Sequence, residues 1–499
     1  MTSPTTPAAT AESPGDSPEV SERLTPHSSP LLARLRALLF SPVEIGWLVF
    51  FRIAFGGIML WEVWRYFELD RIRRYYIEPH FHFTYYGFGW VKPWEGDGMY
   101  HHFYALGALS LAIMLGFHYR LSAVLFFFGF TYVFLLDQSQ HLNHFYLVCL
   151  ISFLMIFVPA HRAFSVDAWR RPKLRSSTVP AWSLWLLRAQ IGLVYFYGGI
   201  AKTGSDWLAG EPMRTWLADS MDFPLIGHTF QDERVVNGFV YGGMLLDLFV
   251  VPALLWKRTR IWAFLAAVAF HLMNARLFSI GIFPWFMLCA TVIFFPPDIP
   301  RRIWQALRGK KAASNPAATS TPSTGPWTRS QSAVGILMAC YLAFQILMPL
   351  RHLAYPGNVD WTEEGHRFSW HMKLRSKDAE VMFYITDLRN GHIMEVYPGE
   401  YLNERQAGKM STRPDMILQF AHYLAKQLKH QDFEEVEVRA HVMASLNGRK
   451  PQLLVDPKVD LSRVPRSLAP ASWILPLTEP LKRREPAVST PRLAVQTDE

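Results

Sequence analysis

The chain has 499 residues, of which half are hydrophobic and 15% are aromatic, and its formal net charge is +9 at pH 7. That length could fill two or three soluble domains, but the apolar residues gather in long runs, which favours a membrane protein. The basic residues lie in short loops between those runs and form no continuous stripe, so the positive charge argues for membrane topology and against nucleic-acid binding.

The first part of the chain predicts a tail followed by a membrane region. Residues 1–40 are rich in Pro, Ser and Thr and lack the charged and apolar regions of a signal peptide, so we expect a disordered cytoplasmic tail. Residues 41–350 hold the apolar runs, which predict a membrane α-helical bundle of about nine transmembrane helices, although several runs are shorter than the ~20 residues that a lone span needs. The runs are 43–67, 100–117, 121–136, 146–158, 182–200, 239–256, 261–273, 280–295 and 332–350.

The distribution of basic residues predicts the orientation of the bundle. Lys and Arg are concentrated before the first run and in the loops after the fourth, sixth and eighth runs. The positive-inside rule places those loops and the N-terminus in the cytoplasm. The first loop is discordant, because Arg71, Arg73, Arg74 and Lys92 lie there, although acidic residues accompany them. An odd number of spans then puts everything after Leu350 outside the cytoplasm.

The C-terminal part changes character. Within the membrane region, 312–326 is a low-complexity stretch that predicts a cytoplasmic linker. Residues 351–476 predict an extracytoplasmic α+β, strand-rich domain, and Asn447-Gly448 marks a tight hairpin turn. Its expected elements are strands at 380–386, 392–397 and 436–442 and a helix at 414–428, and the hairpin turn leads into Leu453–Val455. Residues 477–499 predict a disordered tail. The three cysteines fall inside apolar runs and form no disulfide framework.

The sharpest local signal lies where the fifth run ends, at Tyr195-Phe-Tyr-Gly-Gly-Ile-Ala-Lys202-Thr-Gly-Ser-Asp206-Trp207. An amine at the mouth of a membrane helix is costly unless it is paired, snorkels to the interface or is used in function. On the predicted topology Lys202 faces the outer side, and polar side chains from two other runs reach the same face. They are Asn143, His144, His271, Asn274 and Arg276. We predict that these residues line one pocket near the outer interface.

Each of these side chains also has a structural explanation. Lys202 could snorkel, His144 could be a hydrogen-bonded packing residue, and the pair His271 and Asn274 at i, i+3 suits a shared hydrogen bond better than a metal. No metal-ligand spacing is present, so we predict no metal. His101 and His102, together with His144 and His271, leave a haem or quinone redox protein open. A transporter or lipid-binding protein in which Lys202 only anchors a helix is also open.

These segments resemble the vitamin K-dependent γ-glutamyl carboxylases and their bacterial relatives of the HTTM type, from the first run to about Leu477. The sequence Tyr-Phe-x-x-Gly-x-x-Lys202, followed by Asp206-Trp207, is similar to the catalytic-lysine segment of that family. Leu142–Tyr146 is similar to its histidine segment, and His271–Pro284 is the longest match. In the outer domain, Phe368-Ser-Trp370-x-Met372 and Asp456–Asp460 also resemble family segments. The animal enzymes join the two parts by a disulfide, for which this chain has no cysteine outside its apolar runs.

The resemblance implies a carbon–carbon lyase that couples O2-dependent epoxidation of reduced vitamin K, a phylloquinol or menaquinol, to carboxylation of protein glutamate by CO2. No side chain can remove a γ-proton directly, because a gap of about ten pKa units above lysine costs roughly 14 kcal/mol, so oxidation of the quinol supplies the base. A quinol epoxidase without peptide carboxylation is the nearest alternative. The expected partners are a lipid quinone, a glutamate-containing protein and the bilayer.

The resemblance also implies roles for the site residues. Lys202 becomes the catalytic base, and His144 hydrogen-bonds the quinol oxygen and stabilises its developing charge. A partly dry helix mouth favours the neutral amine that this role needs. The residues expected to bind quinol or substrate are Asn143, His271, Asn274, Arg276 and Trp370.

Overall fold

The computed structural model describes residues 30–278, 280–309, 327–429 and 435–481. The predicted linker at 312–326, most of the N-terminal tail and most of the C-terminal tail lie outside these ranges. Residues 30–40, which the sequence placed in the tail, form helix α1 (Pro30–Phe40).

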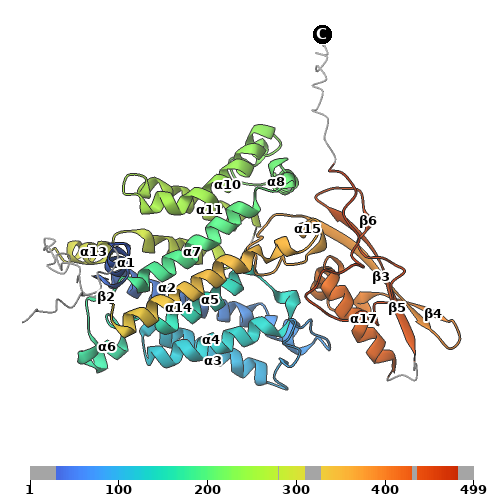
Figure 1. The fold of residues 1–499 in the computed structure, drawn as a ribbon, viewed down its shortest axis with the longest axis horizontal. Coiled ribbons are helices and arrows are strands. Elements are labelled where there is room, and N and C mark those ends of the chain that lie inside the picture. The colour runs from blue at the N-terminus through green and yellow to red at the C-terminus, as the bar shows by residue number, and fades with distance from the viewer. Residues whose placement is uncertain (1–29, 279, 310–326, 430–434, 482–499) are drawn as a thin grey trace, which may run out of the picture.

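A bundle of long helices makes up one end of the molecule, and a small strand-rich domain caps the other (Figure 1). All nine predicted runs coincide with helices. They are α2 (Gly46–Glu68), α3 (Gly98–Leu115), α4 (Tyr119–Leu136), α5 (Asn143–Phe157), α7 (Trp182–Ala201), α10 (Glu233–Leu255), α11 (Arg260–Phe278), α12 (Phe283–Thr291) and α14 (Arg329–Leu347). The shorter helices are α6 (Val166–Arg170), α8 (Ser205–Leu208), α9 (Met213–Ala218), α13 (Ile299–Leu307), α15 (Val359–Thr362) and α16 (Glu404–Ser411).

The number of spanning helices is lower than predicted. Within the described residues, six helices are long and apolar enough to cross a membrane, or seven if the bent pair of α12 and α13 is one span. That pair bends by 96° after the chain reaches Pro296-Pro297. Helix α5 has only 15 residues, which is too short for an independent span. The count of nine is therefore not confirmed, although a bundle of membrane-type helices is present.

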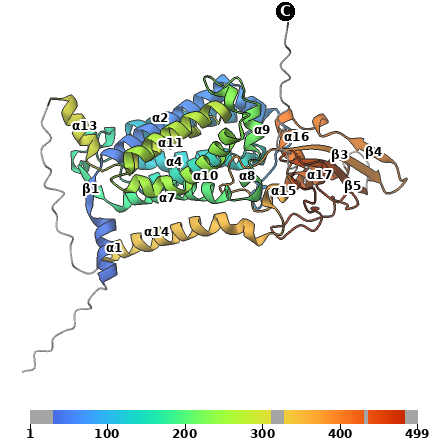
Figure 2. The ribbon, with the colours of Figure 1, turned by 90° about the horizontal axis from the view of Figure 1, so that it is seen from above.

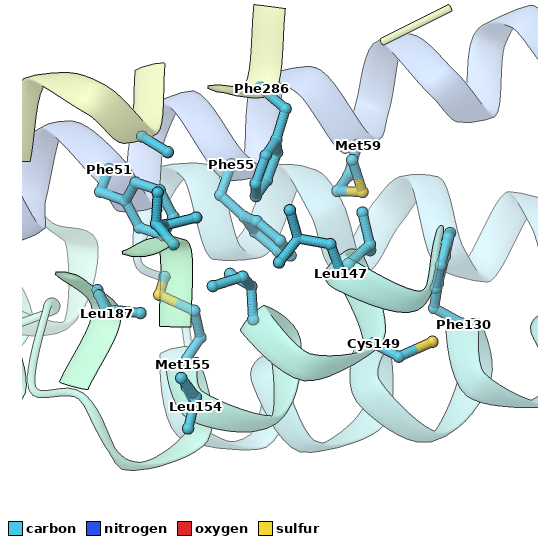
Figure 3. Close-up of a cluster of buried hydrophobic side chains, with 14 of the residues drawn as sticks. Phe51, Phe55, Met59, Phe130, Leu147, Cys149, Leu154, Met155, Leu187 and Phe286 are labelled. Atoms are coloured by element: carbon cyan, nitrogen blue, oxygen red, sulfur yellow. The ribbon is translucent and has the colours of Figure 1, made fainter. Parts of the chain in front are cut away.

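Aromatic and aliphatic side chains from several helices hold the centre of the bundle together (Figure 3). Phe286 of α12 packs edge-on against Phe51 and Phe55 of α2, with ring centroids 6.2 and 6.3 Å apart. Leu147 of α5 and Leu187 of α7 are fully buried in the same cluster. Only 11% of the apolar stretch of α11 is buried, compared with 61% for α7, so α11 presents its apolar surface outward, as a lipid-facing helix does.

Two basic segments of the bundle lie at the end farthest from the strand domain. Helices α1 and α13 are at the end opposite the strands in both views, and α14 runs along the outside of the bundle toward the strand domain (Figures 1 and 2). Two segments predicted to be cytoplasmic therefore share one end. The discordant first loop is charge-compensated, because Arg71 lies 3.5 Å from Glu62 and Arg73 lies 2.5 Å from Asp70.

The outer domain is a four-stranded antiparallel sheet with one long helix packed on it. The strand order is β4-β3-β5-β6, and helix α17 (Pro414–Lys429) packs against β5. The strands are β3 (Lys377–Asp387), β4 (Ile393–Val396), β5 (Val436–Leu446) and β6 (Gln452–Leu453); a separate short pair, β1 (Pro42–Glu44) and β2 (Thr178–Pro180), lies in the bundle. Asn447 and Gly448, both with positive φ, form the predicted hairpin turn between β5 and β6. All four predicted elements of this domain are present.

Hydrogen bonds and ion pairs join the outer domain to the bundle. Cys149, Cys289 and Cys340 are all free. The guanidinium of Arg449 donates from both terminal nitrogens to the two carboxylate oxygens of Asp206, at 2.6 and 2.8 Å, and the amide of Asn447 donates to the same carboxylate. Because Asp206 lies just after Lys202, the outer domain holds the segment that follows this lysine.

Candidate functional site

A cavity of about 1130 Å³ lies where the bundle meets the outer domain. Helices α5, α7, α10, α11 and α12 contribute its inner half, and the outer domain contributes the segment 363–377 and residues of α16. Cavities of this size bind drug-sized ligands in proteins, and a site between two structural units is a common place for them. The cavity is thus the first candidate for a functional site.

Five of the seven predicted site residues line this cavity: Asn143, His144, Lys202, His271 and Asn274. Arg276 does not, because it lies two residues beyond Asn274 on α11 and so points about 200° around the helix from it, toward the exposed side. Trp370 does not line the cavity either. Its indole is 1% exposed and packs against the ring of Tyr146, with centroids 5.1 Å apart.

Lys202 is paired with a buried carboxylate. Its Nζ lies 2.6 Å from Oδ2 of Asp247 on α10 and 3.2 Å from the carbonyl oxygen of Gly198, and the two charged side chains are only 9% and 7% exposed. The indole ring of Trp207 lies beside the ammonium, 5.5 Å from Nζ to the ring centroid. Lys202 therefore does not snorkel; it stays at the end of α7 as half of a buried ion pair.

Close packing of α7 against α10 brings this pair together. A Cβ added to Gly199 would lie 2.7 Å from the Leu248 side chain and 2.9 Å from the Leu248 backbone nitrogen. Only glycine lets the two helices approach this closely. Since Asp247 precedes Leu248, the same contact places its carboxylate beside the end of α7.

His144 leaves its ring nitrogens available to a ligand. It lies in the first turn of α5, and its ring is 5.9 Å from that of Phe283, centroid to centroid. The imidazole makes no hydrogen bond to any residue that the structure describes. Its neighbour Asn143 donates from Nδ2 to the His371 carbonyl at 3.1 Å, while Oδ1 of Asn143 is buried without a partner in the described chain.

His271 is held differently from His144. Its Nε2 is 2.6 Å from the hydroxyl of Tyr195, which is also 3.2 Å from the hydroxyl of Thr291. Its ring packs edge-on against the ring of Phe283, with centroids 6.2 Å apart. Phe283 therefore adjoins both imidazoles, and the inner half of the cavity combines two histidines with aromatic walls.

The outer half of the cavity, which the outer domain lines, has an excess of positive charge. Its basic side chains are Lys373, Arg375, Lys377, Arg405, Lys409 and Arg413, and Arg65 and Arg71 line the bundle side. Two carboxylates face them: Glu62 pairs with Arg65, and Glu363 pairs with Arg375 at 2.5 Å. Lys409 and Arg413 form no salt bridge within the described ranges. Burial, together with the nearby positive charges of Arg413 and Arg405, lowers the pKa of the Lys409 ammonium to about 8. An anionic ligand would relieve this repulsion.

Sequence reasoning missed three of these residues. Asp247 could have been predicted from the sequence, because a carboxylate inside an apolar run is rare and is usually functional or paired. Lys409 and Arg413 lie in and just after α16, a helix that the sequence analysis did not predict. Their meeting with the bundle depends on how the outer domain docks.

The four histidines considered for a haem site do not all line the cavity. His101 and His102 are outside the cavity lining, and Nε2 of His102 lies 3.0 Å from the carbonyl of Gly129. Across the residues that the structure describes, no group of three or more His, Cys, Asp or Glu side chains is placed to hold a metal ion.

Two protein-family models match the chain. The HTTM domain matches residues 40–299, and the vitamin K-dependent gamma-carboxylase, lumenal domain, matches residues 330–480. No solved structure matches. The first match covers the helical bundle up to the start of α13, and the second covers α14 and the outer domain. The cavity is therefore lined by residues of both matched regions.

Proposed function

The chain belongs to the vitamin K-dependent gamma-carboxylase family, and we propose that it couples O2-dependent epoxidation of a reduced lipid quinone to carboxylation of glutamate in a protein substrate. The observation that carries this proposal is the shared cavity, in which Lys202 and His144 lie below a cationic outer half. Membership of the family implies an enzyme that uses reduced vitamin K and a multi-pass membrane protein with a lumenal C-terminal region. We further propose that the N-terminus is cytoplasmic.

The inner half of the cavity fits a quinone ring. His144 offers unpaired ring nitrogens, and Phe283 and Phe270 supply aromatic walls. Helix α11, most of whose apolar surface is exposed, gives a lipid-soluble ligand a membrane-facing side to approach from. Bound here, reduced vitamin K would supply, through its oxidation by O2, the base that a glutamate γ-proton requires.

The chain's own residues then have distinct tasks. In the proposal, Nζ of Lys202 accepts a proton from the quinol, and the imidazole of His144 hydrogen-bonds the ring oxygen and stabilises its negative charge. The buried walls around them exclude water, which would otherwise quench a strong base. Asn143 orients the same turn through its bond to the His371 carbonyl.

The glutamate side chain needs a cationic partner in the outer half. We propose Lys409 and Arg413 for this task, since both line the cavity and neither forms a salt bridge with a carboxylate of the described chain. Arg276, the earlier candidate, faces away from the cavity. Trp370 is buried against Tyr146, and neither of these two residues lines the cavity.

The test is an incubation of the detergent-purified protein with reduced vitamin K, O2, labelled bicarbonate and a glutamate peptide. Epoxide and incorporated label are measured separately, so epoxide without label would assign the epoxidase reaction alone. Lys202→Ala should lose epoxide formation while Lys426→Ala, a change at an exposed lysine of the outer domain, should keep it. Unchanged epoxide formation by a folded Lys202→Ala protein would refute the proposal.

A further inference from the structure

The ion pair of Lys202 and Asp247 conflicts with the role of Lys202 as a base. A base needs a free lone pair on nitrogen, but Nζ lies 2.6 Å from a carboxylate oxygen and 3.2 Å from a carbonyl oxygen, the surroundings of an ammonium group. Both contacts stabilise an ammonium more than a neutral amine. Something must remove a proton before Lys202 can accept one.

Burial makes Asp247 suited to receive that proton. Both side chains are more than nine-tenths buried, and burying separate charges costs several kcal/mol per ion unless they are paired. Moving the proton from Nζ to Oδ2 removes both charges and keeps the hydrogen bond between the two groups. In a dry site the neutral pair is thus close in free energy to the ion pair.

We infer that Asp247 controls when Lys202 can act as a base: its carboxylate stabilises the ammonium, and the amine becomes free when the ammonium proton passes to Oδ2 of Asp247. In this step the N–H bond at Nζ breaks and an O–H bond forms at Oδ2 of Asp247, with no net gain or loss of protons by the pair. The inference rests on the proposed function of Lys202, and it makes Asp247 a positioning residue that acts through the lysine.

Other titratable groups of the surrounding elements contact other residues. They are Tyr195 on α7, Asp206 on α8, His271 on α11 and Lys373 in the outer domain. Tyr195 and His271 are hydrogen-bonded to each other, and the Asp206 carboxylate is bound by Arg449. The Lys373 ammonium lies over the Phe278 ring, 4.9 Å from its centroid. Asp247 is therefore the carboxylate in direct contact with Lys202.

The first experiment needs no quinone. Reductive methylation of the intact protein with formaldehyde and a borane reductant, followed by mass spectrometry of the Lys202 peptide, reports the pH at which the neutral amine appears. Asp247→Asn should lower that pH by about 1 to 3 units, because a buried ammonium loses its counter-charge. Asp247→Glu should stay near the wild type. Asp298→Asn, which alters an ion pair with Arg302 in α13, is the matched control and should change nothing.

Each result decides the inference. An unchanged or raised pH in folded Asp247→Asn would overturn it. If Asp247→Asn does not fold, folded Asp247→Glu decides: a carboxylate that leaves Lys202 as protected as in the wild type supports the inference, and a Lys202 that reacts at clearly lower pH overturns it. The acidic limb of epoxide formation should move with the methylation curve. If the wild type forms no epoxide, the proposed function fails, whereas the methylation curves still test Asp247.

Discussion

Replacing Arg449 with leucine should loosen the outer domain where it touches the segment after Lys202. Arg449 donates two hydrogen bonds to Asp206 at 2.6 and 2.8 Å, and its Nε donates to the Glu479 carbonyl at 3.0 Å. The side chains of the pair are only 8% and 13% exposed. In Arg449→Leu the Asp206 carboxylate keeps only its bond from Asn447.

The size of the effect follows from this burial. Removing one partner of a buried ion pair typically costs about 3–5 kcal/mol, because the remaining charge stays desolvated. At about 1.4 kcal/mol per factor of ten, local opening of the hairpin should become roughly a hundredfold to a thousandfold or more easier. An exposed ion pair, by comparison, contributes about 0–1 kcal/mol.

Hydrogen exchange measured by mass spectrometry is the assay, and Arg439→Leu is the control. Arg439 lies on the same strand, β5, and pairs with Glu437 at 2.6 Å, but its side chain is 43% exposed. Peptides covering 444–450 and 203–208 should lose protection in Arg449→Leu and keep it in Arg439→Leu. Equal loss in both variants, or none in Arg449→Leu, would show that the buried pair does not hold the domains together.

Two further predictions follow from the cavity and its walls. Gly199→Ala should destabilise the bundle by about 1–3 kcal/mol and lower its melting temperature, because the added methyl group overlaps with Leu248. An unchanged melting temperature would contradict the close approach of α7 and α10. Since burial lowers the pKa of Lys409 to about 8, its charge is lost as pH rises through 8, so the KM for a glutamate peptide should rise up to about tenfold between pH 7 and 9. Lys409→Arg should keep KM flat across that range, and a wild-type KM that is also flat would exclude Lys409 from the peptide site.

Local patterns in the sequence were enough to predict most elements. Apolar runs located every long helix, because a membrane helix needs little beyond a long apolar stretch. Alternation and the Asn447-Gly448 pair located β5 and its turn, since positive φ at both positions favours these residues. The number of helices that cross the membrane could not be predicted from these patterns. Whether α5 or α12 crosses a membrane alone depends on exact helix ends and on a bend, which composition does not define.

Sequence and topology predicted only those site residues that lie at the ends of apolar runs on the same side of the membrane. Lys202, His144 and His271 could be assigned to one face because each closes or opens an apolar run. The pairing of Lys202 with Asp247 could not, because it depends on one close helix crossing at Gly199. The cationic outer half depends on the docking of a separate domain, so neither its residues nor their charge balance follow from local pattern.

The charge distribution explains how one cavity could serve two ligands of opposite solubility. On the bundle side, Lys202 and Asp247 form a buried ion pair that is neutral overall, so this pair presents no net charge to a lipid-soluble ring. The outer half of the cavity carries cations that exceed the carboxylates around them, so an acidic peptide is attracted from the aqueous side. The end of α7 is connected to both parts of the molecule. Lys202 pairs with Asp247 of α10, and Asp206, which follows Lys202, pairs with Arg449 of the outer domain. Lys202 can lie beside both a lipid-soluble ligand and an acidic one only if its positive charge is neutralised within the site. The carboxylate of Asp247 provides that neutralisation.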